Sequence, residues 1–159
     1  MVFKVNAKKS ILFAADSMLG KLARYLRILG YDTVYQSNYQ ENELLKLSAK
    51  GRIILTKNQK TFTSYPDAIL IEHNTVKDQI KIVDKKIGLT RDHNAWFNRC
   101  SLCNSILSKV EEDVARENVP DFVFAHHPKN ILFCPACKKF YWPGTHKDNM
   151  VEKLKGWGF

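Results

Sequence analysis

Four cysteines are the residues of this sequence whose type and spacing most directly predict chemistry. They occur as two CxxC pairs, CSLC at 100–103 and CPAC at 134–137, with 30 residues between the pairs. One CxxC turn places two thiolates on the same side of a metal ion, and a second turn completes a tetrahedral site. Four sulfur ligands suit Zn²⁺ and leave no open position, which indicates a structural ion, with rubredoxin-like iron as the minor alternative. The expected ligands are Cys100, Cys103, Cys134 and Cys137.

A second group of candidate residues stands where apolar, strand-like segments end. Asp16 follows the segment 10–15, and Asn58 comes two residues after the segment 52–56. In open α/β proteins ligands bind at the carboxyl ends of the strands, so both side chains are expected at one edge of a sheet. A simpler role for Asp16 is to cap the helix that follows, and a simpler role for Asn58 is that of a turn residue.

Three glutamates could add carboxylate oxygens to this edge. Glu41 and Glu43 open a helical segment, and Glu72 ends an apolar segment with His73 beside it. Mg²⁺ or Mn²⁺ needs two or more such oxygens, with water and phosphate in the remaining positions. The alternative for the two helix-opening acids is a favourable interaction with the helix dipole.

Positive charge is concentrated in the first part of the chain. The sequence holds 25 Lys and Arg against 16 Asp and Glu, a net charge of +9, and residues 1–92 carry 16 basic and 9 acidic side chains. This excess predicts a polyanionic partner, most simply nucleic acid. Lys21, Arg24 and Arg27 follow one another at i, i+3 and i+6 in the helical segment 17–30. They predict a phosphate track beside Asp16, with a basic helix face that contacts only solvent as the alternative.

Hydrophobic periodicity predicts the elements that position these residues. Strand-like and helical segments alternate up to residue 92, which implies a parallel sheet flanked by helices with right-handed crossovers. We expect Ser17 to cap the first helix, Gly30 to end it, and Leu45 to face the core together with two neighbouring leucines. The expected strands are 10–15, 32–35, 52–56 and 67–72, and the expected helices are 17–30, 41–51 and 75–88.

The pattern changes near residue 92, where we expect a boundary between domains at 1–92 and 93–159. The second part holds the cysteine pairs, short strand-like pieces and helical segments at 109–118 and 145–157. No apolar run approaches the roughly 18 residues that span a bilayer, and the N-terminal sequence lacks the pattern of a signal peptide. We therefore expect a cytoplasmic protein without a membrane partner.

Several motifs together resemble the Mut-seven C-terminal RNase-like family, over nearly the whole chain. The first and last of these motifs are specific, and the resemblance implies an α/β fold with a PIN-like nuclease domain at 1–92 and a zinc ribbon at 93–159. The motifs are FAADSMLGKLARYLRILGYDT at 13–33, ENELLKLS at 41–48, GRIILTKNQ at 51–59, CSLCN at 100–104 and CPACKKFYWPGTHKDNM at 134–150.

The resemblance implies a metal-dependent endoribonuclease with a structural Zn²⁺ and a catalytic Mg²⁺ or Mn²⁺. Asp16 matches the first acid of the family, and Glu43, or less closely Glu41, matches the helix-opening acid. Asn58 stands where the family usually has aspartate, and Lys57 before it joins the RNA-binding candidates. An amide brings no negative charge, so we expect weakened metal binding and slow cleavage. The alternative is a catalytically inactive module that binds RNA or a ribonucleoprotein such as the ribosome.

The terminal motif adds His146 and the aromatic run Phe140, Tyr141 and Trp142. Aromatic side chains near lysines could stack on bases, but the core of a small zinc ribbon is the simpler explanation for most of them. His146 could contact RNA or pack against the active edge, and a histidine fixed by local hydrogen bonds at a helix start is the simpler explanation.

Overall fold

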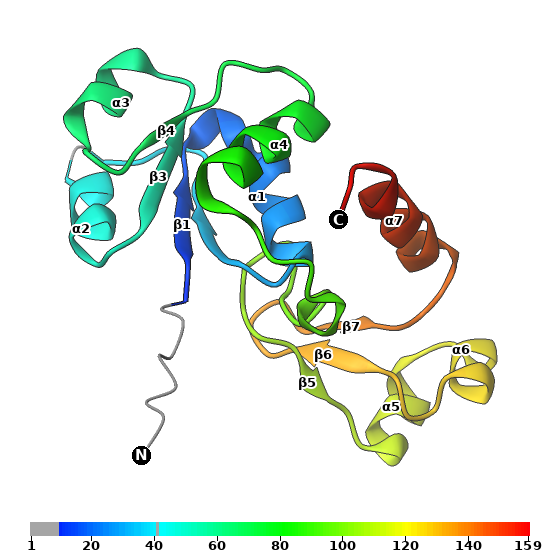
Figure 1. The fold of residues 1–159 in the computed structure, drawn as a ribbon. Coiled ribbons are helices and arrows are strands. Elements are labelled where there is room, and N and C mark those ends of the chain that lie inside the picture. Colours follow the sequence, from blue (N-terminus) through cyan, green and yellow to red (C-terminus); the bar gives the residue numbers. More distant parts are fainter. Residues whose placement is uncertain (1–9, 41) are drawn as a thin grey trace, which may run out of the picture.

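A parallel four-stranded sheet forms the centre of the first part of the molecule (Figure 1). The computed structural model describes residues 10–40 and 42–159. The strands are β1 (Leu12–Ala15), β2 (Asp32–Tyr35), β3 (Ile53–Thr56) and β4 (Ile69–Leu70), in the spatial order β2-β1-β3-β4. Strand β1 pairs with both β2 and β3, so Ala15 lies opposite Tyr35 on one side and Leu55 on the other. The predicted α/β sheet is confirmed.

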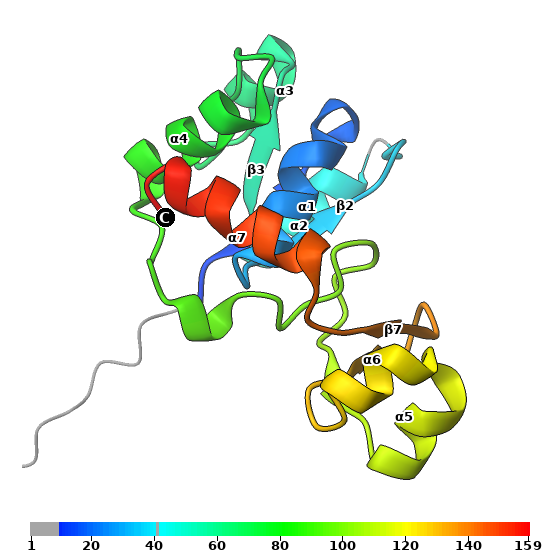
Figure 2. The same cartoon turned by 90° about the vertical axis from the view of Figure 1, so that its right-hand side faces the viewer.

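Helices cover both faces of this sheet (Figure 1, Figure 2). A 3₁₀ turn, η1 (Ser17–Leu19), leads into α1 (Gly20–Ile28), which packs with α4 (Val76–Ile87) on one face. Helices α2 (Glu43–Ala49) and α3 (Gln59–Ser64) lie on the other face. The chain leaves β1 toward β2 and then crosses back to β3, so the strand order reverses between β1 and β3. In open α/β folds the crevice at such a reversal, outside the carboxyl ends of the strands, binds ligands.

Gly30 ends α1 as predicted. Its φ of +95° is a conformation that glycine adopts without steric cost. The Gly30 N–H donates to the Arg27 carbonyl at 3.0 Å and the Tyr31 N–H to the Leu26 carbonyl at 2.9 Å, which is a Schellman ending. A Cβ atom on Gly30 would lie 2.6 Å from the carbonyl oxygen of Ala95, so this glycine also lets the second part of the chain approach.

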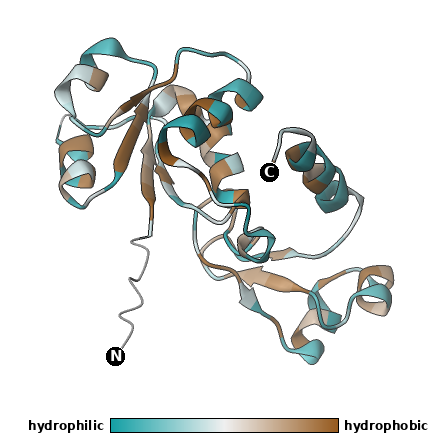
Figure 3. Cartoon of the chain, in the orientation of Figure 1, coloured by the Kyte–Doolittle hydropathy of each residue, from teal (hydrophilic) through white to brown (hydrophobic). Residues whose placement is uncertain are grey.

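The hydrophobic core lies between the sheet and the helices α1 and α4. Figure 3 shows the central strands β1 and β3 as mostly hydrophobic and the surrounding helices as a mixture of hydrophobic and hydrophilic residues. No helix in the described residues is both long and apolar enough to cross a membrane. On α2, Leu45 is 58% exposed, so the prediction that it faces the core is wrong; this short helix covers the sheet without burying any residue completely. Fully buried side chains include Phe13, Leu22, Leu26, Leu55 and Ile80.

The second part contains a three-stranded antiparallel sheet, reached through a 3₁₀ turn, η2 (His93–Ala95). The strands β5 (Ser108–Lys109), β6 (Leu132–Cys134) and β7 (Lys139–Tyr141) pair in this order. Helices α5 (Glu112–Asn118) and α6 (Asp121–His126) are inserted between β5 and β6 and pack on each other. The helix expected at 109–118 starts later because β5 pairs with β6, and α6 has no counterpart among the predicted elements.

The last helix, α7 (Thr145–Gly156), returns to the first part of the molecule (Figure 2). Leu154 is fully buried in the same core as α1 and α4, and Phe159 is 6% exposed there. Trp157 stacks on Tyr25 of α1, with 5.1 Å between the ring centroids. Residues 145–159, predicted to belong with the zinc ribbon, therefore pack with the first part, and the chain crosses back over the expected division at residue 92.

Candidate functional site

The four cysteines meet at one point of the second part. Their Sγ atoms all lie within 4.8 Å of one another, with 3.8 Å between Cys100 and Cys137 and 3.4 Å between Cys103 and Cys134. Around a tetrahedral zinc ion with Zn–S bonds of about 2.3 Å, the sulfur atoms are roughly 3.8 Å apart. The donor set and its spacing therefore fit a zinc ion, which these residues would hold with no position left for a substrate.

The electrostatics of the cluster also favour a cation. Burial raises the pKa of the Cys103 thiol, but hydrogen bonds with the hydroxyl and backbone of Ser105 outweigh burial and lower this pKa to about 6. The hydrogen bond with Cys103 raises the pKa of Cys137 to about 12. One thiolate is therefore favoured while a neighbour stays protonated, and a bound metal ion would favour the ionised form of all four cysteines.

Arg27 of α1 holds the first cysteine turn against the first sheet. This turn, residues 100–104, is the metal knuckle. Arg27 is 3% exposed. Its guanidinium donates to the carbonyls of Thr33 (2.8 Å), Ser101 (3.1 Å) and Leu102 (2.9 Å). Burial lowers the pKa of Arg27, and the nearby cysteines oppose this shift. The prediction that Arg27 belongs to an exposed phosphate track is wrong, because its donors are already bonded to backbone carbonyls.

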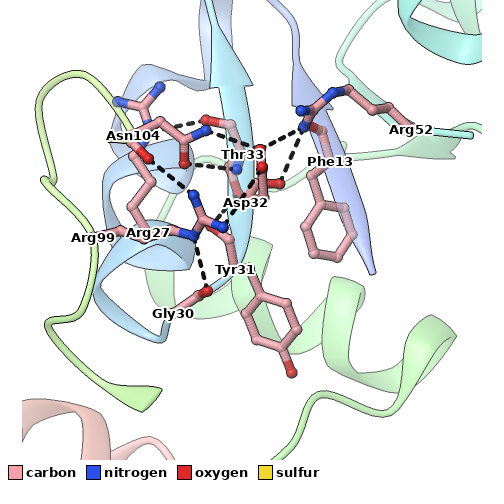
Figure 4. A network of polar contacts seen from close by, with 9 residues as sticks. All are labelled: Phe13, Arg27, Gly30, Tyr31, Asp32, Thr33, Arg52, Arg99 and Asn104. Atoms are coloured by element: carbon pink, nitrogen blue, oxygen red, sulfur yellow. Dashed lines mark hydrogen bonds and ion pairs between the residues drawn. The ribbon is translucent and has the colours of Figure 1, made fainter. Parts of the chain in front are cut away.

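Asp32 connects the same network to the edge strand β2 (Figure 4). Its carboxylate accepts from Arg52 at 2.7 Å and from the Asn104 amide at 2.9 Å, and Arg99 lies 3.6 Å away. Asn104 accepts in turn from the Thr33 N–H at 3.0 Å, which covers a donor of the edge strand. Burial alone would raise the pKa of Asp32, but the hydrogen bonds from Arg52 and Asn104 hold it below its usual value. The metal knuckle and β2 thus form one hydrogen-bonded unit.

Asp16 lies at the carboxyl edge of the sheet, at the reversal between β1 and β3. Its backbone N–H donates to the Leu55 carbonyl at 2.8 Å. One carboxylate oxygen accepts from the Ser17 N–H at 2.6 Å, and the other accepts from the Thr56 hydroxyl at 2.7 Å. Asp16 rather than Ser17 therefore caps η1, which corrects the predicted cap. The same carboxylate stands where open α/β proteins bind ligands.

Asn58 is connected to Asp16 through Thr56. Its N–H donates to the Thr56 hydroxyl at 3.0 Å, and that hydroxyl donates to Asp16. Its side-chain oxygen accepts from the Thr61 N–H at 3.0 Å and so caps α3. An aspartate would cap a helix equally well. Of the three side chains at positions 16, 56 and 58, only that of Asp16 carries a negative charge.

Glu43 borders the same edge together with Tyr39, a residue that no sequence pattern singles out. The Tyr39 hydroxyl donates to the carbonyl of Ala15 at 3.0 Å, directly before Asp16. Burial raises the pKa of Tyr39 to about 12, and the negative charges of Asp16 and Glu43 add to this shift. The Glu43 carboxylate accepts from the Gln40 N–H at 2.6 Å. Tyr39 lies in a loop, where hydrophobic periodicity carries no information.

The structure does not join Glu72, another of the predicted acids, to Asp16. Glu72 is exposed beyond β4, and within the described residues it shares no hydrogen bond or ion pair with Asp16; Glu41 lies outside the described residues. The backbone carbonyl of His73 accepts a hydrogen bond from the Gln79 side chain at 2.9 Å. Among residues 10–40 and 42–159, the four cysteines are the only group of three or more His, Cys, Asp or Glu side chains placed to hold a metal. The edge offers the carboxylates of Asp16 and Glu43 and the amide of Asn58.

Both predicted RNA-binding lysines lie on the α1 and α4 side of this edge. Lys21 and Arg24 are exposed on α1, and Lys57 donates to the side chain of Asn74 at 2.8 Å. Asn74 and Lys21 line the same shallow depression, next to Met18. Asn74 therefore links Lys57 to the depression that Lys21 lines, and Arg24 continues along α1.

The aromatic residues of the last motif divide between two environments. The Tyr141 hydroxyl lies 3.1 Å from the Cys100 sulfur, and Phe140 packs on Phe133 with 4.9 Å between ring centroids, as expected for a ribbon core. Trp142 is 38% exposed, and His146 is exposed in the first turn of α7. Trp142 is therefore not buried in the ribbon core, and among the described residues His146 shares no hydrogen bond with the carboxylate edge.

Comparison with known proteins gives one family. The family described as Mut7-C RNAse domain matches residues 11–154, which is nearly the whole chain. Searches of curated proteins and of solved structures found no match. The matched range contains the four cysteines and the three residues Asp16, Glu43 and Asn58.

Proposed function

The chain belongs to the Mut7-C RNAse domain family, and from this premise we propose that it binds single-stranded RNA at the carboxyl edge of the first sheet. The observation that carries the proposal is the position of Asp16 at the strand-order reversal, with Lys21 and Lys57 beside it. The lysines supply contacts to phosphate groups, and the carboxylate supplies the acidic ligand chemistry of a nuclease. We place this function in the cytoplasm, where thiols stay reduced and available to zinc.

Cleavage at this edge is proposed to be slow. Asp16 and Glu43 would hold Mg²⁺ or Mn²⁺, an ion that polarises a phosphate group and activates water when bound. Such hard cations depend on carboxylate charge, and Asn58 offers only a neutral oxygen that already accepts from Thr61. Asp16 is itself engaged by the protein, since both of its oxygens accept hydrogen bonds.

A binding module without catalysis is the second candidate, and the same Asn58 favours it. In that case the edge holds RNA through Lys21 and Lys57, and the carboxylates serve as a helix cap and as acceptors within the protein. Ribosomal RNA or a ribonucleoprotein would then be the partner. Cleavage assays separate the two candidates, whereas binding assays test what they share.

The salt dependence of RNA affinity tests the proposed edge. Fluorescence anisotropy of a labelled single-stranded RNA gives the affinity at several salt concentrations. The double variant Lys21→Glu/Lys57→Glu is expected to weaken binding and to flatten the slope of log affinity against log salt by about 1.4. This value follows because each phosphate contact contributes about 0.7 for a single strand.

A matched control separates local contacts from net charge. Lys85→Glu/Lys109→Glu makes the same change in charge at two exposed lysines, one in the last turn of α4 and one in β5. Its slope is expected to stay close to that of the wild-type chain. Equal slopes in the two double variants would contradict the proposed edge, and a wild-type chain that binds no RNA would contradict the function itself.

A further inference from the structure

A cavity of about 380 Å³ between the zinc ribbon and α7 has no role in the site described above. Four segments line it: the end of α1, the stretch 97–107, the strands β6 and β7 with adjacent residues, and the first turns of α7. Pockets for small organic ligands have volumes of about 300–1,000 Å³ and are mostly apolar with a few polar groups. The cavity therefore has the size of a site for one small planar ligand.

Aromatic rings make up much of the wall. Trp142, 38% exposed, lines the cavity together with Phe97, Phe140 and Tyr141. Phe97 has a φ of +59°, a conformation that bulky residues rarely adopt and that persists only where the surrounding structure holds it. An accessible tryptophan ring is a stacking surface for a base, and such stacking tolerates every base because each has a π-face.

The charged groups at the wall favour an anionic ligand. Among the described residues that line the cavity none is acidic. The Arg99 guanidinium already donates to the carbonyls of Gly30 at 3.2 Å and Asn104 at 3.0 Å. Lys147 makes no ion pair within the described residues, and its Nζ lies 5.0 Å from the centroid of the Phe97 ring. Lys147 is therefore the cation that can pair with a phosphate next to the aromatic wall.

The position of the cavity connects it with the proposed RNA edge. Lys21, Arg24 and Ile28 are spaced at i, i+3 and i+7, so they share one face of α1, and Ile28 lines the cavity. This face begins next to Asp16. The helical residues 17–28 cover about 18 Å, a length that about five stacked nucleotides span at roughly 3.4 Å each.

We propose that this cavity binds one unpaired nucleotide of the RNA, with its base stacked on Trp142 and its phosphate at Lys147. The inference rests on the proposed RNA-binding function and adds a second contact point, about five nucleotides from the carboxylate edge. A strand held at both points would lie along the basic face of α1.

The affinity of Trp142→Ala for a single-stranded RNA ten-mer tests the proposal. Loss of one base stack is expected to weaken binding about 5- to 150-fold without changing the salt slope. Trp142→Phe should recover most of the affinity, because it restores an aromatic face. Phe122→Ala is the matched control, since Phe122 is an aromatic residue of α6 that is 68% exposed and lies outside the cavity. Lys147→Ala should flatten the slope by about 0.7 and serves as the second variant if Trp142→Ala does not fold.

RNA length and a free nucleotide complete the test. A three-mer cannot span both contact points. Trp142→Ala should therefore reduce the affinity for the three-mer less than it reduces the affinity for the ten-mer. Equal affinities of wild type and Trp142→Ala for the ten-mer would overturn the cavity proposal and leave the proposed function standing. Adenosine monophosphate that binds as tightly as the ten-mer would assign the cavity to a free nucleotide and also overturn the proposal. A wild-type chain without any RNA affinity would instead refute the proposed function.

Discussion

At the residue scale, the three basic side chains of α1 differ in what their donors contact. Six positions at about 100° per residue place Arg27 about 120° around the helix from Lys21, so these two residues do not share a face. Arg27 is 3% exposed and donates to three carbonyl oxygens, whereas Lys21 and Arg24 remain in solvent. A buried guanidinium with this set of acceptors holds the structure together, because removing it leaves the acceptors unpaired.

Arg27→Lys is expected to lower the free energy of unfolding by about 2–4 kcal/mol, because an ammonium group cannot reproduce the planar fork that reaches three carbonyls. Urea unfolding measures this change. Arg24→Lys is the control, and at an exposed position it should change stability by no more than about 0.5 kcal/mol. A stable Arg27→Lys protein with a flatter salt slope for RNA binding would show that Arg27 contacts RNA after all.

At the scale of elements, the metal knuckle acts as a cover for the edge strand β2. Asn104 accepts the Thr33 N–H, and Arg27 joins the carbonyl of Thr33 to those of Ser101 and Leu102. An edge strand without such a cover presents free donors and acceptors to solvent or to other chains. The turn that carries two of the predicted zinc ligands is therefore hydrogen-bonded to a strand that lies outside the ribbon.

Removal of the metal with a strong chelator should accelerate hydrogen exchange at the Thr33 amide. Without zinc the knuckle loses its fixed shape, and the Asn104 oxygen leaves the Thr33 N–H. The loss of one such hydrogen bond predicts an increase of about tenfold in the exchange rate. The Leu55 amide in the centre of the sheet is the internal reference and should keep its protection. An unchanged rate at Thr33 would mean that the knuckle holds its place without metal.

Elements with strong local signals were predictable from the sequence, and contacts between distant elements were not. Helix α4, expected at 75–88, runs from Val76 to Ile87, because its apolar stripe, threonine cap and final glycine all agree. The two CxxC pairs likewise predicted the cluster. In α7 the apolar residues Met150, Leu154 and Trp157 form a stripe at i, i+4 and i+7. Such a stripe indicates that one face of the helix is buried, but it does not indicate which element covers that face. For this reason α7 was predicted to belong with the zinc ribbon.

Within the candidate site the same limit applies. Asp16 and Asn58 could be placed from the sequence because each follows a predicted strand, and parallel strands end at one edge. The Thr56 hydroxyl that joins them, and Tyr39 beside them, depend on side-chain contacts between segments that are distant in sequence. Arg27 was misassigned because charge and spacing do not reveal burial.

At the scale of the whole molecule, the C-terminal helix α7 packs into the hydrophobic core of the first part of the chain. The ribbon is therefore held at two places, by the metal knuckle on β2 and by the return of α7 to α1 and α4. Between these two attachments lies the cavity lined by Trp142 and Lys147. Rigid attachment at both ends fixes the distance between this cavity and the carboxylate edge.

Leu154→Ala is expected to destabilise the first part of the molecule by about 2–5 kcal/mol, as the loss of a fully buried leucine does in a well-packed core. Chemical unfolding followed by the exchange of core amides in β1 and β3 measures the effect. Phe122→Ala, which removes a side chain that is 68% exposed, should change stability by about 0.5 kcal/mol or less. Equal effects of the two variants would mean that α7 is not part of this core.

The most direct measurement compares RNA cleavage by wild type, Asn58→Asp and Asn58→Ser in the presence of Mn²⁺. Asn58→Asp restores a carboxylate at the edge and still caps α3, so it should raise the cleavage rate by at least about tenfold, or about 1.4 kcal/mol of transition-state stabilisation. Asn58→Ser caps the helix without adding charge and should cleave no faster than wild type. Adding Asp16→Asn to Asn58→Asp should abolish the gain, because it removes the other carboxylate next to Thr56. Wild-type protein that cleaves as fast as Asn58→Asp would contradict the account.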